Sequence, residues 1–422
     1  MTATAEPTDP AFLAGNNTLK SRLRRAERMR KVWALALIAP MFIFLMVSFI
    51  IPIISLLKLS VEDLEVSEAL PRTVEAFRAW DGEGFPPPEA MQLFAEELVV
   101  AEENKTLGSA TRRLNYSLSG FKSMLKKTGR KAEDDLVGVP ADQILDAFIA
   151  VDKDWGDPAY WRAIKDAVGP LSDFYMLWAL DRQRDAEGNI EARPESQSIY
   201  VDVLLRTLEI SIAVTVICFV LGLPIAYLLA TLPTSKSNLL LILVLLPFWT
   251  SLLVRTTAWI VLLQNQGLIN DTGIWLGLWN EPLELIRNRF GVYVAMVHIL
   301  LPFMILPIFS VMKGINPWHM RAAESLGAHR WKAFLKVYLP QCLPGIGAGT
   351  LLVFILSLGY YITPALVGGP TDQMISFWIV ENMGAVLNWG LAAALSVILL
   401  LLTLVFFFIY NRFVGFDKLR LG

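Results

Sequence analysis

Six runs of mainly apolar residues, each more than twenty residues long, are separated by polar stretches along the chain. About 20 apolar residues in a helix cover the ~30 Å hydrocarbon core of a bilayer. The pattern therefore predicts an all-α membrane protein with six transmembrane helices. The predicted spans are residues 32–57, 204–232, 239–263, 292–312, 346–367 and 391–414.

The polar stretches divide the chain into further parts. Residues 1–31 form a predicted N-terminal tail, which is irregular over residues 1–19 and basic after that. Residues 58–200 hold no spanning run but show helical periodicity, with acidic residues near the predicted helix starts. We expect a mostly helical insertion there, followed by a five-helix core over residues 201–422. The expected helices of the insertion are 89–104, 141–151 and 159–180.

Charge divides these parts between two sides of a membrane. The chain has a formal net charge of −2, but residues 58–200 hold 17 Lys and Arg against 27 Asp and Glu, so the remainder is basic. Basic residues lie before the first span, at Lys236 and in the segment 313–345, whereas the short loops on the other side hold only Arg287 and Arg289. Because Lys and Arg concentrate in cytoplasmic loops, both termini are predicted to be cytoplasmic and the acidic insertion periplasmic. With 55% hydrophobic residues and a mean hydropathy of +0.49, the chain is too apolar for a soluble globular protein.

The segment between the fourth and fifth predicted spans is charged and helical. From Arg321 to Ile346 it reads RAAESLGAHRWKAFLKVYLPQCLPGI. Its alanines favour a short helix, which Gly327 interrupts. Apolar residues then recur at three- and four-residue steps from Trp331 to Tyr338, which gives a second helix one apolar face. Pro340 and Pro344 are expected to stop this second helix before the next span. A charged helical hairpin between two spans suggests a docking surface for a soluble partner, and an ordinary basic loop is the alternative.

This segment resembles the cytoplasmic loop of ABC-type importer permeases. That loop reads EAA, three residues, Gly, nine residues, Ile, one residue, Leu-Pro. The alanines, the glycine and Leu-Pro are matched here, while Arg321 replaces the first Glu and Val337 replaces Ile. The resemblance implies a type I importer permease fold whose 313–345 loop inserts a coupling helix into a separate ATPase. The residues that it assigns to this contact are Arg321, Ala322, Ala323, Glu324, Gly327, Ala328, Leu339 and Pro340.

The same resemblance implies an assembly in the bacterial inner membrane. This multi-pass chain would pair with an identical or homologous permease, with two ATP-binding subunits and with a periplasmic substrate-binding protein. The sequence holds no G-x-x-x-x-G-K-[ST] phosphate loop. We therefore expect the partner ATPase, and not this chain, to use ATP and Mg²⁺. No nucleic-acid partner is expected, and the remaining contact is with membrane lipid.

Polar side chains within the predicted spans are candidates for the translocation pathway, because ionisable groups are costly in a bilayer. The candidates are Glu209, Trp249, Arg255, Trp259, His298, Tyr360 and Tyr361. Their depths roughly coincide, so they are expected to face one cavity. Either Glu209 and Arg255 form a buried ion pair that fixes helix packing, or Glu209 attracts a cationic substrate flanked by aromatic cation–π faces.

A second resemblance bears on the substrate. The stretches PFWTSLLVRTTAWIVLLQNQGLIN, Pro247 to Asn270, and YYITPALVGGPTDQMISFWI, Tyr360 to Ile379, are similar to permeases of the spermidine/putrescine branch. That likeness implies a polyamine or a related small cation. Import of an amino acid or opine, of ferric ion or of thiamine by the same machinery is the alternative.

Other classes of protein are less well supported by the sequence. Cys218 lies in a predicted span and Cys342 in the 313–345 segment, at different depths, so no disulfide is expected. None of the three histidines forms a ligand pair with these cysteines, so no metal site is expected. An ion-coupled carrier would need a relay of membrane carboxylates, for which Glu209 is the only candidate. A membrane-anchored enzyme would need a catalytic constellation in the insertion, and we find none, so no catalytic residue is assigned. The insertion is either a structural addition or a docking element for an external binding protein.

Overall fold

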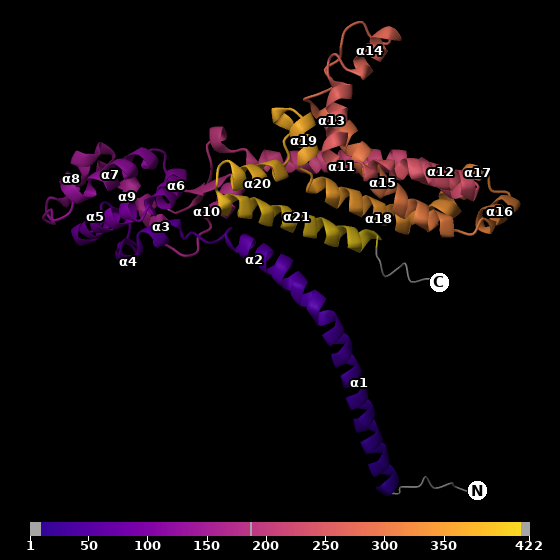
Figure 1. Ribbon diagram of the computed structural model, residues 1–422, viewed down its shortest axis with the longest axis horizontal. Coiled ribbons are helices and arrows are strands. Elements are labelled where there is room, and N and C mark those ends of the chain that lie inside the picture. Colours follow the sequence, from indigo (N-terminus) through magenta and orange to yellow (C-terminus); the bar gives the residue numbers. More distant parts are fainter. Residues whose placement is uncertain (1–9, 186–187, 415–422) are drawn as a thin grey trace. The chain divides into compact units, whose positions relative to one another are not determined.

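The structure is a computed structural model that describes residues 10–185 and 188–414. It divides into two compact units, the first ending at Lys58 and the second beginning at Leu59. Figure 1 shows the elements in chain order.

The first unit is a long, largely apolar helix. It consists of α1 (Pro10–Leu45), a π-helical turn (Met46–Ile50) and α2 (Ile51–Lys58). Its stretch Ala26–Lys58 is long and apolar enough to cross a membrane, and this stretch contains the first predicted span. The irregular tail predicted for residues 1–19 is wrong for residues 10–19, which are helical, and residues 1–9 lie outside the described part of the chain.

The insertion in the second unit is helical, as predicted, and has a hydrophobic core of its own. Phe94, Phe148, Trp155 and Trp161 pack together at its centre, with the two indole rings 4.5 Å apart between centroids. Its helices are α3 (Glu65–Ala69), α4 (Pro71–Ala79), α5 (Pro88–Glu103), α6 (Leu107–Ser117), α7 (Phe121–Asp135), α8 (Ile144–Val151), α9 (Pro158–Asp166) and α10 (Phe174–Ala179).

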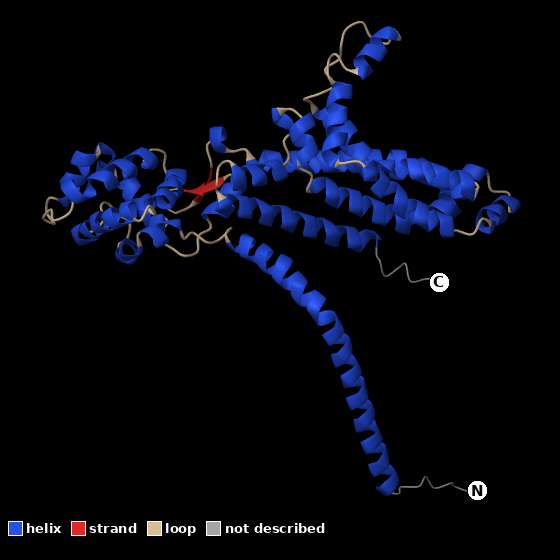
Figure 2. Ribbon diagram, viewed as in Figure 1, coloured by secondary structure: helices blue, strands red, loops and turns tan. Residues whose placement is uncertain are grey.

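Two details of the insertion differ from the prediction. The single helix expected over 159–180 is split into α9 and α10, because Gly169-Pro170 interrupts it and Leu171 instead bridges to Glu62. Short antiparallel strands β1 (Arg182–Arg184) and β2 (Ile190–Ala192) follow, with Arg182 opposite Ala192. They form the only sheet in the described residues (Figure 2).

The insertion is attached firmly to the helices that follow it. The Tyr175 ring of α10 lies directly against Gly390, where an added Cβ would come within 2.3 Å of the ring. The Tyr175 hydroxyl group donates to Glu65 at 3.2 Å. The Asp181 carboxylate accepts three backbone N–H groups of residues 199–201 and so satisfies the start of the next long helix. The insertion is thus packed and hydrogen-bonded to the bundle, not held by a loose linker.

The bundle is built around three long helices. Helices α11 (Tyr200–Thr231), α15 (Arg289–Gly314) and α18 (Leu339–Leu358) lie side by side, and α21 (Trp389–Val414) runs along α18 (Figure 1). Gly345 and Gly349 of α18 meet the backbone of α15, where an added Cβ would lie 2.7 and 3.0 Å from carbonyl oxygens. Small residues at this four-residue spacing allow close helix contact in a membrane. The remaining elements are α12 (Thr234–Leu245), a 3₁₀ turn (Leu246–Trp249), α13 (Leu252–Leu263), α14 (Leu268–Trp275), α16 (Trp318–Ser325), α17 (Arg330–Ala333), a π-helical turn (Phe334–Tyr338), α19 (Ile362–Val367) and α20 (Ile375–Gly384).

In the described residues, five helices are long and apolar enough to span a membrane, and one bent pair is a sixth candidate. That pair, residues 234–249 and 252–275, bends by 98° in the run predicted as the unbroken third span. The helix ends because Pro247 has no N–H group for an intrahelical bond, and the chain is extended at Thr250 and Ser251. The fifth predicted span is also interrupted, between Leu358 and Ile362.

The helix stop predicted at Pro340 and Pro344 is wrong. Residues 330–358 form one continuous helical stretch that passes through both prolines. A π-helical turn precedes Pro340, and the N–H group of Leu339 bonds the carbonyl of Phe334, five residues earlier. The first unit has the same kind of π-helical turn before Pro52, where the N–H group of Ile51 bonds the carbonyl of Met46. The wider turn makes room for a proline ring that would otherwise clash with the preceding turn.

Candidate functional site

The 313–345 hairpin begins with a helix whose end is shaped by Gly327. Helix α16 ends in two backbone bonds, from Gly327 N–H to the Glu324 carbonyl at 2.9 Å and from Ala328 N–H to the Ala323 carbonyl at 3.1 Å. This bond pattern is a Schellman cap, which requires a left-handed residue just after the helix. Gly327 has φ +86° and adopts that conformation without a side-chain penalty. The sequence spacing between Ala322-Ala323 and Gly327 therefore follows from the geometry of this helix cap.

The second arm of the hairpin starts from a capping histidine. The Nδ1 atom of His329 accepts the N–H group of Trp331 at 3.3 Å. Arg330 lies 3.7 Å from Glu324, which joins the two arms. His319 of α16 contacts Gln341 of α18 at 2.8 Å, so the first arm is also tied to the long helix. The hairpin therefore has a defined shape set by contacts on both arms.

The hairpin exposes apolar side chains together with charge. Leu326 is 90% exposed, and Trp318 and Trp331 are also exposed. Arg321, Ala322, Glu324 and Gly327 are exposed, whereas Ala323 and Ala328 are half-buried. Leu339 and Pro340 begin α18, with Pro340 exposed. Large exposed apolar groups close together are typical of interaction surfaces.

An apolar groove lies beside the hairpin. It has a volume of about 490 Å³ between α11 and the two arms. Its walls are Leu223, Pro224, Tyr227, Met320, Arg330, Trp331 and Phe334.

The second candidate region lies at the opposite ends of the long helices, near the insertion. Of the two readings given for Glu209, the buried ion pair with Arg255 is wrong. Glu209 forms an ion pair with Arg289 at 2.8 Å, not with Arg255. Arg289 also binds Asp372 through Nε at 2.8 Å. Asp372 is only 6% exposed and also accepts the N–H group of Gly369, whereas Glu209 is 63% exposed. One arginine thus joins α11, α15 and the 368–373 loop, and the more accessible carboxylate is Glu209.

Four of the other pathway candidates do come together. The indole N–H group of Trp259 donates to His298 Nδ1 at 3.2 Å. Arg255 lies on α13 with Trp259, and α13 packs against α15, which carries His298, and against α19, which begins just after Tyr360. The hydroxyl groups of Thr256 and Thr363 lie 3.1 Å apart and join α13 to α19 beside this cluster.

The last two aromatic candidates are Trp249 and Tyr361. Trp249 is exposed in the break of the bent pair, and Tyr361 pairs with Phe377 at 6.3 Å between ring centroids. In the part of the chain that the structure describes, no three His, Cys, Asp or Glu side chains gather as metal ligands.

Sequence reasoning missed Arg289 and Asp372 as a pair. In the sequence Arg289 falls in a short loop between two predicted spans, and Asp372 lies 83 positions further along the chain. The available signal was weak: Asp372 follows Gly368-Gly369-Pro370, a turn sequence in which an acidic side chain commonly bonds local N–H groups.

A family model and similar sequences point to one family. Residues 210–415 match the family described as "Binding-protein-dependent transport system inner membrane component". The chain is 34% identical to the spermidine/putrescine transport system permease protein PotB of Salmonella typhimurium, over 51% of this chain and 75% of that protein. It is 33% identical to the inner membrane ABC transporter permease protein YdcU of Escherichia coli, over 52% of this chain and 73% of that protein. A bacterial alginate ABC transporter solved with an alginate pentasaccharide-bound periplasmic protein matches with a TM-score of 0.44 and 19% identity, covering 50% of this chain and 77% of that one.

Proposed function

The chain belongs to the family of binding-protein-dependent transport system inner membrane components, and from this premise we propose that it forms half of the translocation pathway of an ATP-driven importer. It is a multi-pass inner-membrane protein. Two ATP-binding subunits, a second permease and a periplasmic substrate-binding protein complete the proposed assembly. ATP and Mg²⁺ act in the partner ATPase, and this chain carries out transport without catalysis of its own.

The 313–345 hairpin carries the proposed coupling. Its Schellman cap fixes the angle between α16 and the second arm, and its exposed Trp318, Leu326 and Trp331 offer apolar contact area. The second arm continues without interruption into α18. A displacement of the hairpin by a partner ATPase would therefore move a bundle helix directly, which is the rigid connection that alternating access needs.

The substrate is proposed to be a polyamine or a related small cation. The likeness to spermidine/putrescine permeases supports this choice. The carboxylate of Glu209, paired with Arg289 but 63% exposed, offers a binding group. The test is a screen for substrate-stimulated ATP hydrolysis by the assembled complex, using polyamines, amino acids, opines, thiamine and ferric ion. Stimulation by polyamines alone is expected, and stimulation only by another class would replace this assignment.

The charge of Glu209 is expected to matter for uptake. We expect Glu209→Gln to lower polyamine uptake about tenfold at unchanged protein level, because a charge–cation attraction at a partly exposed site is of the order of 1–4 kcal/mol. Radiolabelled putrescine uptake measures this. Asp202→Asn is the matched control, since Asp202 is an exposed acid on the same helix. Equal uptake in the Glu209→Gln variant and the control would remove Glu209 from the pathway.

The insertion is proposed to help dock the external binding protein. Its contacts through Tyr175 and Asp181 support this role, because a partner bound to it would be held in a fixed position against the ends of α11 and α21.

A further inference from the structure

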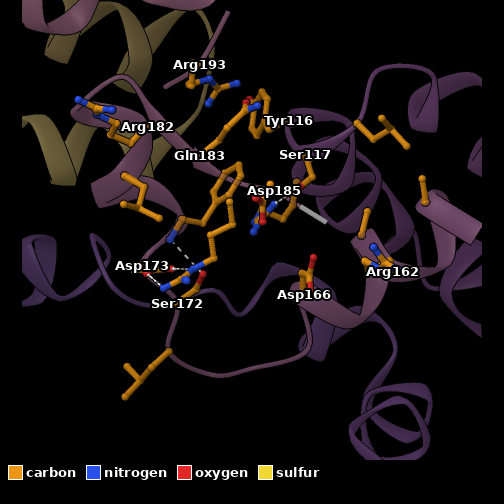
Figure 3. A pocket seen from close by; sticks show the side chains of 18 residues that line it. Tyr116, Ser117, Arg162, Asp166, Ser172, Asp173, Arg182, Gln183, Asp185 and Arg193 are labelled. Atoms are coloured by element: carbon orange, nitrogen blue, oxygen red, sulfur yellow. Dashed lines mark hydrogen bonds and ion pairs between the residues drawn. The ribbon is translucent and has the colours of Figure 1, made fainter. Parts of the chain in front are cut away.

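The insertion contains a polar cavity of about 650 Å³. It lies between the end of α6, helix α9, the segment that leads into α10 and strand β1 (Figure 3). Cavities that hold small molecules commonly measure 300–1,000 Å³. The transport function described above makes no use of this space.

One of the residues that line the cavity is a buried arginine, Arg113, whose guanidinium group is already hydrogen-bonded. Arg113 is 2% exposed and binds Asp63 through Nε at 2.8 Å and Nη2 at 2.5 Å. Its Nη1 group donates to Ser117 at 2.7 Å, and its guanidinium carbon lies 3.7 Å from the centre of the Phe174 ring. Asp63 offsets the charge of Arg113, and the Glu65 carboxylate lies close to both of them.

The remaining lining is more positive than its surroundings. Five arginines and three aspartates line the cavity, although the insertion as a whole is acidic. Arg113 is offset by Asp63, and Arg184 pairs with Asp173 at 2.5 Å. The other charged side chains of the lining are Arg162, Arg182 and Arg193 on one side of the balance and Asp166 and Asp185 on the other. Guanidinium groups that exceed the local carboxylates favour an anionic ligand.

Arg182 and Arg193 lie at the same end of the strand pair. Arg182 is directly opposite Ala192, the residue before Arg193. Arg193 stacks on Trp178, with its guanidinium carbon 4.6 Å from the ring centre, and one amino group donates to Gln197. Its buried Nε atom has no hydrogen-bond partner among the described residues. The nearby Asp181 carboxylate is already committed to three N–H groups of α11.

We propose that this cavity binds a small carboxylate of amino-acid or citrate size, with Arg182 and Arg193 as its recognition residues. Arginine binds carboxylates through two parallel N–H bonds, and a buried Nε atom without a partner is the donor that such a ligand satisfies. Burial also lowers the pKa of Arg193, and a bound anion would offset that desolvation.

The site is placed to influence the bundle. Phe174 and Leu177 of α10 line the cavity, while Tyr175 and Ala179 of the same short helix pack with residues of α11, α20 and α21. A ligand in the cavity would therefore contact one face of α10, whose other face holds the insertion to the bundle.

The test measures the binding of citrate and of glutamate to the full-length protein in detergent. Calorimetry and thermal unfolding are the two readouts. We expect saturable binding of at least one of the two below about 10 mM, and no competition by putrescine, which carries no carboxylate. Arg182→Gln and Arg193→Gln are each expected to weaken that binding about tenfold. Lys131→Gln, an exposed change on α7 away from the cavity, should leave it unchanged.

Two results would overturn the proposal. One is the absence of saturable binding of either carboxylate in this range, and the other is equal affinity in the Arg182→Gln variant and the unmodified protein. Arg182 is exposed and its replacement is not expected to affect folding, so this variant decides the matter even if Arg193→Gln fails to fold. Polyamine transport is not part of this readout, so the carboxylate site and the proposed transport function stand or fall separately.

Discussion

Gly327→Val is expected to leave the permease inserted in the membrane but to abolish ATP-driven uptake. Gly327 has φ +86°, a conformation that costs an ordinary L-residue about 1–2 kcal/mol and is least tolerated by β-branched side chains. A Cβ atom at this position meets nothing within 4 Å, so the substitution acts on the backbone and not through a clash. Valine would open the Schellman cap and change the angle between the two arms of the hairpin. Co-purification of the ATPase and uptake in the same preparation measure the loss.

Substitutions that tolerate the left-handed conformation separate shape from charge. Gly327→Asn is expected to retain most uptake, because asparagine adopts positive φ more readily than other residues. Gly327→Asp tolerates the same backbone but adds a negative charge beside Glu324, and we expect it to detach or uncouple the ATPase. Normal co-purification and uptake in both the valine and the aspartate variants would show that the hairpin is not the ATPase contact.

Arg289→Ala is expected to be the most destabilising change near the insertion end of the bundle. It leaves Asp372 buried at 6% exposure with its charge unpaired, and removal of one partner from a buried pair costs ~3–5 kcal/mol. Loss of Glu209 from the same cluster should cost far less stability, because Glu209 is 63% exposed and water replaces its partner. Thermal unfolding of the purified variants compares the two.

A second substitution tests whether the unpaired charge of Asp372 causes the loss of stability. Asp372→Asn in the Arg289→Ala background removes the uncompensated charge and should restore much of the lost stability, as a double-mutant cycle would reveal. If Arg289→Ala and Glu209→Gln unfold at the same temperature, Arg289 does not act by neutralising a buried aspartate.

The prediction from the sequence succeeded where the signal was local and repeated. Apolar length identified the helical spans, and the spacing from Ala322 to Gly327 located the cap of α16, because both depend on neighbours along the chain. The ABC permease family was also correctly identified. Helix breaks were less predictable: Pro247 ends a helix while Pro340 does not, and the difference depends on a π-helical turn that composition does not encode.

Contacts between residues that are far apart in the sequence could not be predicted from the hydrophobic and polar pattern. Arg289 lies at the same end of the bundle as Glu209, but its choice as partner over Arg255 depends on how α11 and α15 pack. The cavity of the insertion likewise combines α6, α9 and a strand pair that no periodicity indicated. Such sites need the tertiary arrangement, because each contributing residue has an ordinary local environment in the sequence.

We propose that a separate ATPase drives transport through this chain. The most direct test places the chain with its co-purifying ATPase and binding protein in proteoliposomes and measures uptake with and without ATP on the ATPase side. We expect uptake to require ATP, loaded binding protein to stimulate ATP hydrolysis, and a proton or sodium gradient alone to drive no uptake. Uptake sustained by an ion gradient in the absence of ATP would contradict it.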